Sequence, residues 1–156
     1  MITIKKYAAI DIGSNAMRLL VTNIVEQNGY TTQFNKSSLV RVPIRLGQDA
    51  FTVGEITTEN IERMIDAMKA FKLLMKVHKV EKYQACATSA LREAYNGKEV
   101  VEIIKNRADI DIDIIDGKKE AAIIASSDLT RFINLDKAFL YVDVGGGSTE
   151  FSVIHH

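Results

Sequence analysis

One short pattern occurs twice in the chain and limits the possible folds more than any other feature. The first copy, Ile10–Asn15, is an apolar run that ends around Asp11 and is followed by small residues. The second copy, Val142–Ser148, has the same form around Asp143, at an offset of 143 − 11 = 132 residues. Apolar residues resume after both turns. The repeat therefore predicts two similar strand pairs, each with a carboxylate beside its turn.

The residues of the two turns suit a phosphate ligand. Small residues after an aspartate let the backbone approach a phosphate and present its N–H groups. A carboxylate beside a phosphate requires a cation, and Mg²⁺ prefers such oxygen ligands. The G-x-x-x-x-G-K-[ST] motif is absent, and the second turn is not followed by the helix that a dinucleotide fingerprint requires. The candidate phosphate-binding residues are Gly13, Ser14 and Asn15 in the first turn, and Gly145, Gly146, Gly147 and Ser148 in the second.

Composition is that of a soluble globular protein with no global attraction to anions. The 156 residues are 47% hydrophobic and 26% charged, enough for one domain that buries about 70% of its unfolded surface. Twenty basic and twenty acidic residues cancel, so net charge recruits neither nucleic acid nor a membrane surface. Cys86 is the only cysteine, and no apolar run approaches the length of a membrane span. These features predict a cytoplasmic protein with no nucleic-acid or membrane partner.

The order of the expected elements predicts an α/β fold. Apolar runs predict strands at residues 7–11, 17–25 and 30–42, and Asn28-Gly29 predicts a hairpin between the last two. A polar loop is expected at residues 45–54. The later elements are expected as helix 57–80, strand 83–87, helix 98–108, strand 109–115, helix 119–132 and strand 138–142. This order predicts a mixed five-stranded sheet with an antiparallel edge, a parallel interior and helices on both faces.

Two charged residues outside the repeat are candidates for phosphate chemistry. Thr88–Glu93 follows a strand and opens a helix, where the first N–H groups have no partner within the helix. Arg92 adds a planar guanidinium that matches phosphate oxygens, although a surface arginine in a first helical turn accounts for it equally well. Glu120 lies at the start of a helix, where an acid is favourable in any protein. The residues alone therefore assign neither side chain a role.

Several segments together resemble the exopolyphosphatase/guanosine pentaphosphate phosphatase family, within the actin-like ATPase superfamily. These segments are Ala9–Asn15 with Arg18–Val21, Arg45–Gly47, Ala87–Ala94, Gly117–Ala121 and Asp143–Glu150. The resemblance implies a ribonuclease-H-like (actin-like ATPase) domain and a second domain of related fold, with the site in the cleft between them. We expect the first domain, with the helix that crosses between domains, at residues 1–134. Residues 135–156 are then the first hairpin of the second domain.

The resemblance also implies roles for individual residues. Glu120 matches the general base that activates water, and Arg92 matches an arginine that grips phosphate. Asp11, Asp143 and Glu150 match acidic positions associated with Mg²⁺ and the reacting phosphate. The activity implied is that of a Mg²⁺-dependent exopolyphosphatase, which releases orthophosphate from the ends of polyphosphate. The alternatives are a guanosine pentaphosphate phosphatase, and a non-catalytic domain that senses polyphosphate or a nucleotide.

The length of the chain and its final hairpin lead to two further predictions. Family members continue well beyond the second turn, so we expect an N-terminal portion that is a poor catalyst by itself. A lone two-stranded hairpin is marginal in water and would expose unpaired, apolar edges. We therefore expect residues 138–154 to pair with another copy, which gives a homodimer, or to dock on their own domain.

Overall fold

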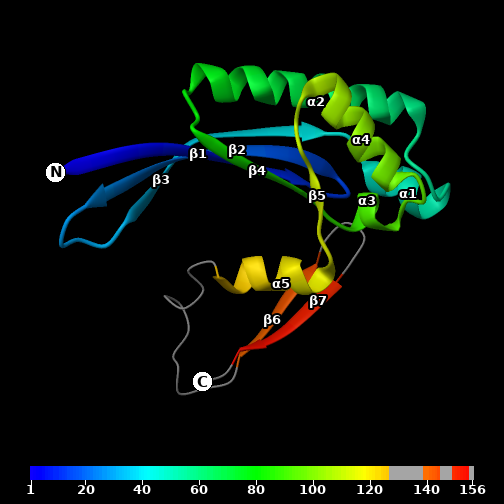
Figure 1. Cartoon of the computed structure of the whole chain (residues 1–156). Helices are drawn as coiled ribbons and strands as arrows, with labels where there is room; N and C mark the ends of the chain where they lie inside the picture. Colours follow the sequence, from blue (N-terminus) through cyan, green and yellow to red (C-terminus); the bar gives the residue numbers. More distant parts are fainter. Residues whose placement is uncertain (127–138, 145–148, 155–156) are drawn as a thin grey trace.

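The computed structural model describes residues 1–126, 139–144 and 149–154, and its centre is a mixed five-stranded sheet of order β3-β2-β1-β4-β5 (Figure 1). The antiparallel part consists of β1 (Ile2–Ile12), β2 (Ala16–Gln27) and β3 (Gln33–Pro43). Two shorter strands, β4 (Lys82–Ala87) and β5 (Asp113–Ile114), extend the sheet in parallel with β1. The predicted mixed sheet with an antiparallel edge is confirmed.

A long helix, α2 (Thr58–Val77), covers one face of this sheet. It begins at Thr57, whose side chain accepts a hydrogen bond from the backbone N–H of Asn60, as a capping threonine should. Its apolar positions recur at helical spacing and form the buried side: Met64, Ile65, Ala67, Met68, Phe71 and Met75. Opposite them lie the inward-facing residues of β1 and β2, which include Ile10, Ile12, Leu19 and Val21.

The second crossover helix, α4 (Gly97–Ala108), lies beside α2 on the same face. The connections from β1 to β4 and from β4 to β5 move in the same direction across the sheet. Right-handed crossovers therefore place both helices on one side. Helix α5 (Gly117–Ser126) lies below the sheet in the view of Figure 1 and contacts β7 (Thr149–Ile154). The second face is less covered, since Ala9 of the central strand is exposed.

Two element predictions were wrong in detail. The segment 45–54, expected to be a loop, contains the helix α1 (Leu46–Thr52), whose residues Leu46 and Ala50 are buried. The strand expected at 109–115 forms ladder pairs only at Asp113–Ile114. Asp109 instead adopts a left-handed conformation (φ 54°) and ends α4 by donating its N–H to the carbonyl of Lys105. The apolar alternation there reflects burial of side chains without strand pairing.

The second copy of the sequence repeat forms a hairpin of its own. Strands β6 (Phe139–Val144) and β7 (Thr149–Ile154) pair antiparallel as a separate two-stranded sheet, which confirms the predicted strand pair. On one face, Leu140 opposite Val153 and Val142 opposite Phe151 are all exposed. The expected domain boundary at 134 lies outside the described residues, and the homodimer stays a prediction. No helix in the described ranges is long and apolar enough to cross a membrane.

Candidate phosphate site at the sheet edge

The first phosphate loop connects β1 to β2 and is fixed by its own backbone and by two neighbouring elements. The N–H of Gly13 donates to the carbonyl of Ala16 at 3.1 Å, which closes the turn. The carbonyl of Ser14 accepts from the N–H of Gly47 at 2.8 Å, so the start of α1 is packed on the loop. The N–H groups of Ser14 and Asn15 have no acceptor among the described residues. Two adjacent free N–H groups on a rigid turn are suited to an anion.

A buried pair of hydroxyl groups joins this loop to the second structural element of the site. Ser14 Oγ lies 2.8 Å from Ser89 Oγ, and both side chains are buried. Ser89 is the first residue of α3 (Ser89–Glu93), which follows β4 directly. The sequence places these serines 75 residues apart, and the parallel pairing of β1 with β4 brings them together. The hydroxyl of Ser14 is thus engaged in packing, while its N–H remains available.

Asp11 stands at the end of β1, opposite Arg18 of β2 in the antiparallel register. Arg18 Nη1 donates to Asp11 Oδ2 at 3.1 Å, which is the single side-chain partner of this carboxylate within the described part of the chain. Partial burial raises the pKa of Asp11, and the charge and hydrogen bond of Arg18 only partly offset this effect. Sequence reasoning missed Arg18 as a partner, although the hairpin register predicts that residues 11 and 18 are directly opposite.

Arg92 and Glu120, the two residues that the sequence alone did not assign, are in contact. Arg92 Nη1 lies 3.4 Å from Glu120 Oε2 and donates to the carbonyl of Ile115 at 2.9 Å. Both side chains are largely buried, with 23% and 18% of their surfaces exposed. Glu120 lies in the first turn of α5. This turn is capped by Asp116, whose Oδ1 accepts a hydrogen bond from the N–H of Lys119 at 2.7 Å. The geometry therefore brings a guanidinium and a carboxylate to one place.

Backbone hydrogen bonds hold the first phosphate loop, α3 and the start of α5 together at the carboxyl ends of the strands, which is the place called the sheet edge here. The N–H of Thr88 donates to the carbonyl of Ile12 at 3.1 Å, and the N–H of Ile115 donates to the carbonyl of Ala87 at 2.9 Å. These bonds join the carboxyl ends of β1, β4 and β5, which is where ligands bind in open α/β sheets. The first loop, α3 and the start of α5 all follow directly from these strand ends.

The second phosphate loop, Gly145–Ser148, lies outside the described residues, so its predicted contact with phosphate is untested. The acidic residues on either side of it are placed only by their backbones. Asp143 of β6 and Glu150 of β7 are paired directly opposite each other in the ladder. One turn of the chain therefore separates the two carboxylates that the family resemblance associates with Mg²⁺.

Asp11 can serve as one ligand of a magnesium ion. Mg²⁺ is commonly held by one or two carboxylates together with phosphate oxygens, and it keeps several of its waters. One oxygen of Asp11 is engaged by Arg18, and its other oxygen has no partner within the described ranges. Within those same ranges, no three His, Cys, Asp or Glu side chains gather closely enough to hold a metal without further ligands. The described residues therefore supply one carboxylate oxygen of Asp11 to the expected Mg²⁺ site, and the metal stays a prediction.

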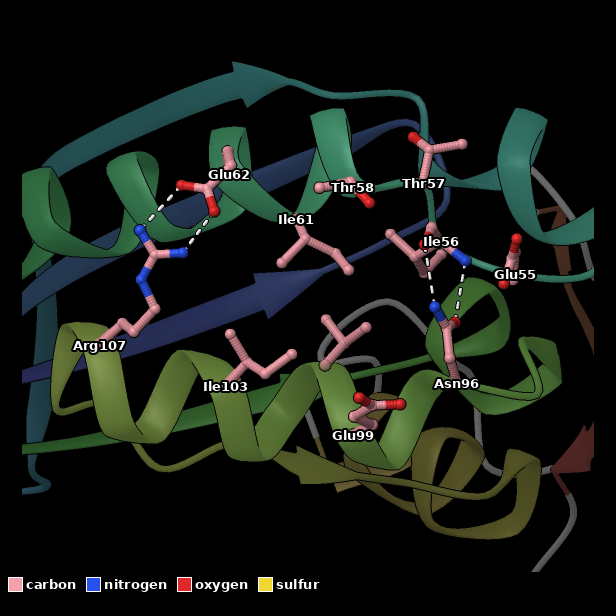
Figure 2. A pocket seen from close by; sticks show the side chains of 11 residues that line it. Glu55, Ile56, Thr57, Thr58, Ile61, Glu62, Asn96, Glu99, Ile103 and Arg107 are labelled. Atoms are coloured by element: carbon pink, nitrogen blue, oxygen red, sulfur yellow. Dashed lines mark hydrogen bonds and ion pairs between the residues drawn. The ribbon is translucent and has the colours of Figure 1, made fainter.

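A pocket of about 320 Å³ lies between α2 and α4 (Figure 2). Its principal polar groups already bind one another. Both terminal nitrogens of Arg107 contact the carboxylate of Glu62, and Arg107 Nη2 lies 2.9 Å from Glu62 Oε2. The side-chain amide of Asn96 is paired at 2.9 Å with both the N–H and the carbonyl of Ile56. None of the predicted site residues lines this pocket.

The sheet order and the phosphate loop at its edge define the chain as a member of the actin-like ATPase fold. The family is shown by a model of the Ppx/GppA phosphatase family, which matches residues 24–156. The chain belongs to this family. The match begins after the first phosphate loop, so the family model does not cover that loop, and its binding of phosphate stays a prediction.

Similar proteins of known structure or curated function agree with this assignment. An exopolyphosphatase from Cytophaga hutchinsonii has a TM-score of 0.84 and 30% identity, over 97% of this chain and 47% of that one. Exopolyphosphatase 2 of Mycobacterium tuberculosis is 27% identical over 97% of this chain and 49% of its own length. A bifunctional 3-dehydroquinate synthase/phosphatase of Fusobacterium nucleatum is 33% identical over 94% of this chain and 22% of its own. The chain thus spans less than half the length of each of these proteins.

Proposed function

We propose that this chain supplies the N-terminal side of the active site of an exopolyphosphatase that hydrolyses the terminal phosphate of inorganic polyphosphate. The observation that carries the proposal is the contact between Arg92 and Glu120 beside the strand end that holds the first phosphate loop. A binding domain needs cations and N–H donors for phosphate, but a carboxylate at the same place would repel the ligand. A carboxylate is useful there when a water molecule must lose a proton.

The chain's own residues account for the steps of hydrolysis. The N–H groups of the first loop and the guanidinium of Arg92 bind the oxygens of the terminal phosphate and hold phosphorus in place for attack. Glu120 accepts a proton from the attacking water as its oxygen bonds to phosphorus. The bridging P–O bond breaks, and the shortened polyphosphate leaves with the bonding electrons. Magnesium, held by Asp11 with Asp143 and Glu150, would neutralise phosphate charge when bound.

The proposal is tested by measuring phosphate release from polyphosphate by the native protein that carries this chain. We expect Glu120→Gln to lower kcat by about 10²–10⁴-fold, the usual contribution of a general base, with little change in substrate affinity. Glu93→Gln is the matched control, because Glu93 Oε1 also lies 3.4 Å from Arg92 but is more exposed. Near-normal turnover in Glu120→Gln, or an equal loss in Glu93→Gln, would contradict the assigned role.

A second candidate substrate is guanosine pentaphosphate, because the description of the matching family names both phosphatase types. The phosphoanhydride chemistry at the terminal phosphate is the same for both substrates. The ratio of kcat/KM for the two substrates, measured with the native protein, distinguishes the two activities. We favour polyphosphate because exopolyphosphatases are among the similar proteins.

A further inference from the structure

A second pocket, of about 280 Å³, lies at the opposite end of the sheet from the phosphate loop. It is formed where α2 ends, β4 begins and α4 ends, on the side of the molecule that holds the N-terminus (Figure 1). Its charged and aromatic lining consists of Lys72, Lys76, Lys82, Glu81, Asp109 and Tyr83. No feature of the proposed hydrolysis uses these residues.

Three lysines and two acids line the pocket, so its charged lining is net positive, and both acids already have partners. Asp109 forms an ion pair with Lys72, and Glu81 Oε1 accepts from the backbone N–H of Lys6 at 3.0 Å. The ammonium groups of Lys76 and Lys82 have no hydrogen-bond or ion-pair partner among the described residues. Lys76 and Lys82 are both exposed. They are therefore free to bind an anion.

Lysine is concentrated in the stretch of sequence that forms much of this pocket. Residues 69–82 contain five lysines and one acid, in a chain whose net charge is zero, and three of these lysines line the pocket. Lys76 lies in the last turn of α2, where a cation also complements the helix dipole. That explanation does not extend to Lys82 on β4. Lys79, in the turn between them, has φ 57°, a left-handed conformation in which glycine is usually favoured.

We propose that this lysine pocket binds a distal stretch of a polyphosphate chain, and this ligand rests on the proposed function. Ammonium groups act as compact point charges for phosphate and need no fixed orientation, which suits a flexible, repeating anion. Strand β4 runs from Lys82 at the pocket to Ala87 at the sheet edge, a span of roughly 17 Å for five residue steps. A long polyphosphate reaches both places, whereas tripolyphosphate occupies only one.

The test compares the equilibrium binding of long-chain polyphosphate and of tripolyphosphate to the native protein. We expect the double variant Lys76→Gln/Lys82→Gln to weaken binding of the long chain by about tenfold, from two exposed charge contacts. Its affinity for tripolyphosphate should be unchanged. Lys36→Gln/Lys98→Gln is the matched control, since it removes the same charge from exposed positions outside the pocket and should leave both affinities unchanged.

Three results would overturn the proposal: an equal loss in the control variant, an equal loss for tripolyphosphate, or no binding of the long chain by the wild-type protein. Single-stranded DNA that competes for the pocket as well as polyphosphate, at equal phosphate concentration, would also overturn the assigned ligand. The binding assay needs no turnover. A failed Glu120 experiment combined with lysine-dependent binding of long chains would therefore reject the proposed hydrolysis and retain the pocket.

Discussion

Two aspartates, Asp49 and Asp11, show how differently this protein treats a carboxylate. Asp49 is 9% exposed and lies in α1, where its Oδ2 accepts three hydrogen bonds from the start of α2. They come from the N–H of Thr57 at 2.9 Å, the hydroxyl of Thr57 at 2.7 Å and the amide of Asn60 at 2.8 Å. Asp11 has a side chain that is 47% exposed, and it has one partner.

The more buried carboxylate is the one that is better stabilised as an anion. Burial raises the pKa of Asp49, but the hydrogen bonds from Asn60 and Thr57 outweigh it and hold the pKa below its ordinary value. Burial raises the pKa of Asp11, and the charge of Arg18 does not compensate. The hydrogen bonds of Thr57 and Asn60 therefore keep Asp49 ionised, whereas Asp11 has only Arg18 to offset its burial. The hydrogen bonds of Asp49 join α1 to α2. The carboxylate of Asp11 has only one partner among the described residues, so it can still bind a cation.

The largest effect on stability is expected from Asp49→Ala. The substitution removes three hydrogen bonds to a charged acceptor and leaves the N–H of Thr57 without its partner. We expect the free energy of unfolding to fall by about 2–4 kcal/mol, measured by chemical denaturation. Asp66→Ala, an exposed position on α2, is the control and should change it by less than about 0.5 kcal/mol. Equal changes in unfolding free energy for the two substitutions would show that the hydrogen bonds of Asp49 contribute no more to stability than an exposed acid does.

A smaller effect is expected at the serine pair beneath the first phosphate loop. Ser89→Ala leaves the buried hydroxyl of Ser14 without its partner, which should cost about 1–2 kcal/mol. The double variant Ser14→Ala/Ser89→Ala removes both hydroxyls, so its cost should be less than the sum of the two single variants. A double-mutant cycle of unfolding free energies measures this coupling. Strict additivity would show that the pair does not hold the loop on α3.

The smallest effect on stability is expected at Asp11, and its pH dependence has the opposite sign to that of Asp49. The lowered pKa of Asp49 gives stability that is present above its unfolded value of 3.8 and is lost as pH falls through the folded pKa. The raised pKa of Asp11 favours the folded state at low pH, and this contribution is lost as pH rises from 3.8 through its folded pKa. Asp11→Asn should therefore reduce the decrease in unfolding free energy that occurs as pH rises from 3.8 through the folded pKa of Asp11.

At neutral pH, Asp11→Asn should change the unfolding free energy by less than about 1 kcal/mol, because the ion pair that it removes is half-exposed. Its Mg²⁺-dependent affinity for phosphate ligands should nevertheless fall. Unfolding curves from about pH 2.5 to 6 test the first statement, and calorimetric titration tests the second. A large loss of stability without loss of affinity would place Asp11 in the same structural class as Asp49.

Local patterns predicted the elements that form the site, and tertiary pairing decided how they meet. The apolar run before Asp11, the small residues of the turn and the cap at Thr57 are all readable from neighbouring residues. The contact between Ser14 and Ser89 depends on β4 lying beside β1, which no local pattern specifies. Helix α1 was missed for a similar reason, since its burial beneath the loop outweighs a polar local sequence.

The proposed catalytic pair shows the limit of local reasoning most clearly. Arg92 and Glu120 each had an ordinary explanation as charged residues in a first helical turn. Their significance comes from parallel strands β4 and β5, whose carboxyl ends place the following helices side by side. The family resemblance pointed to both residues, whereas no local pattern did. The structure adds the contact itself and the engagement of Arg92 by the carbonyl of Ile115.

The most direct test of the proposed phosphate site is a backbone NMR titration of the 156-residue chain with tripolyphosphate and Mg²⁺. We predict the largest shifts at the backbone amides of Ser14 and Asn15, whose N–H groups have no acceptor among the described residues. The amides around Asp49 and those of the pocket between α2 and α4 should remain unchanged. Shifts confined to that pocket, with none at the first phosphate loop, would contradict the assignment of the sheet edge as the phosphate site.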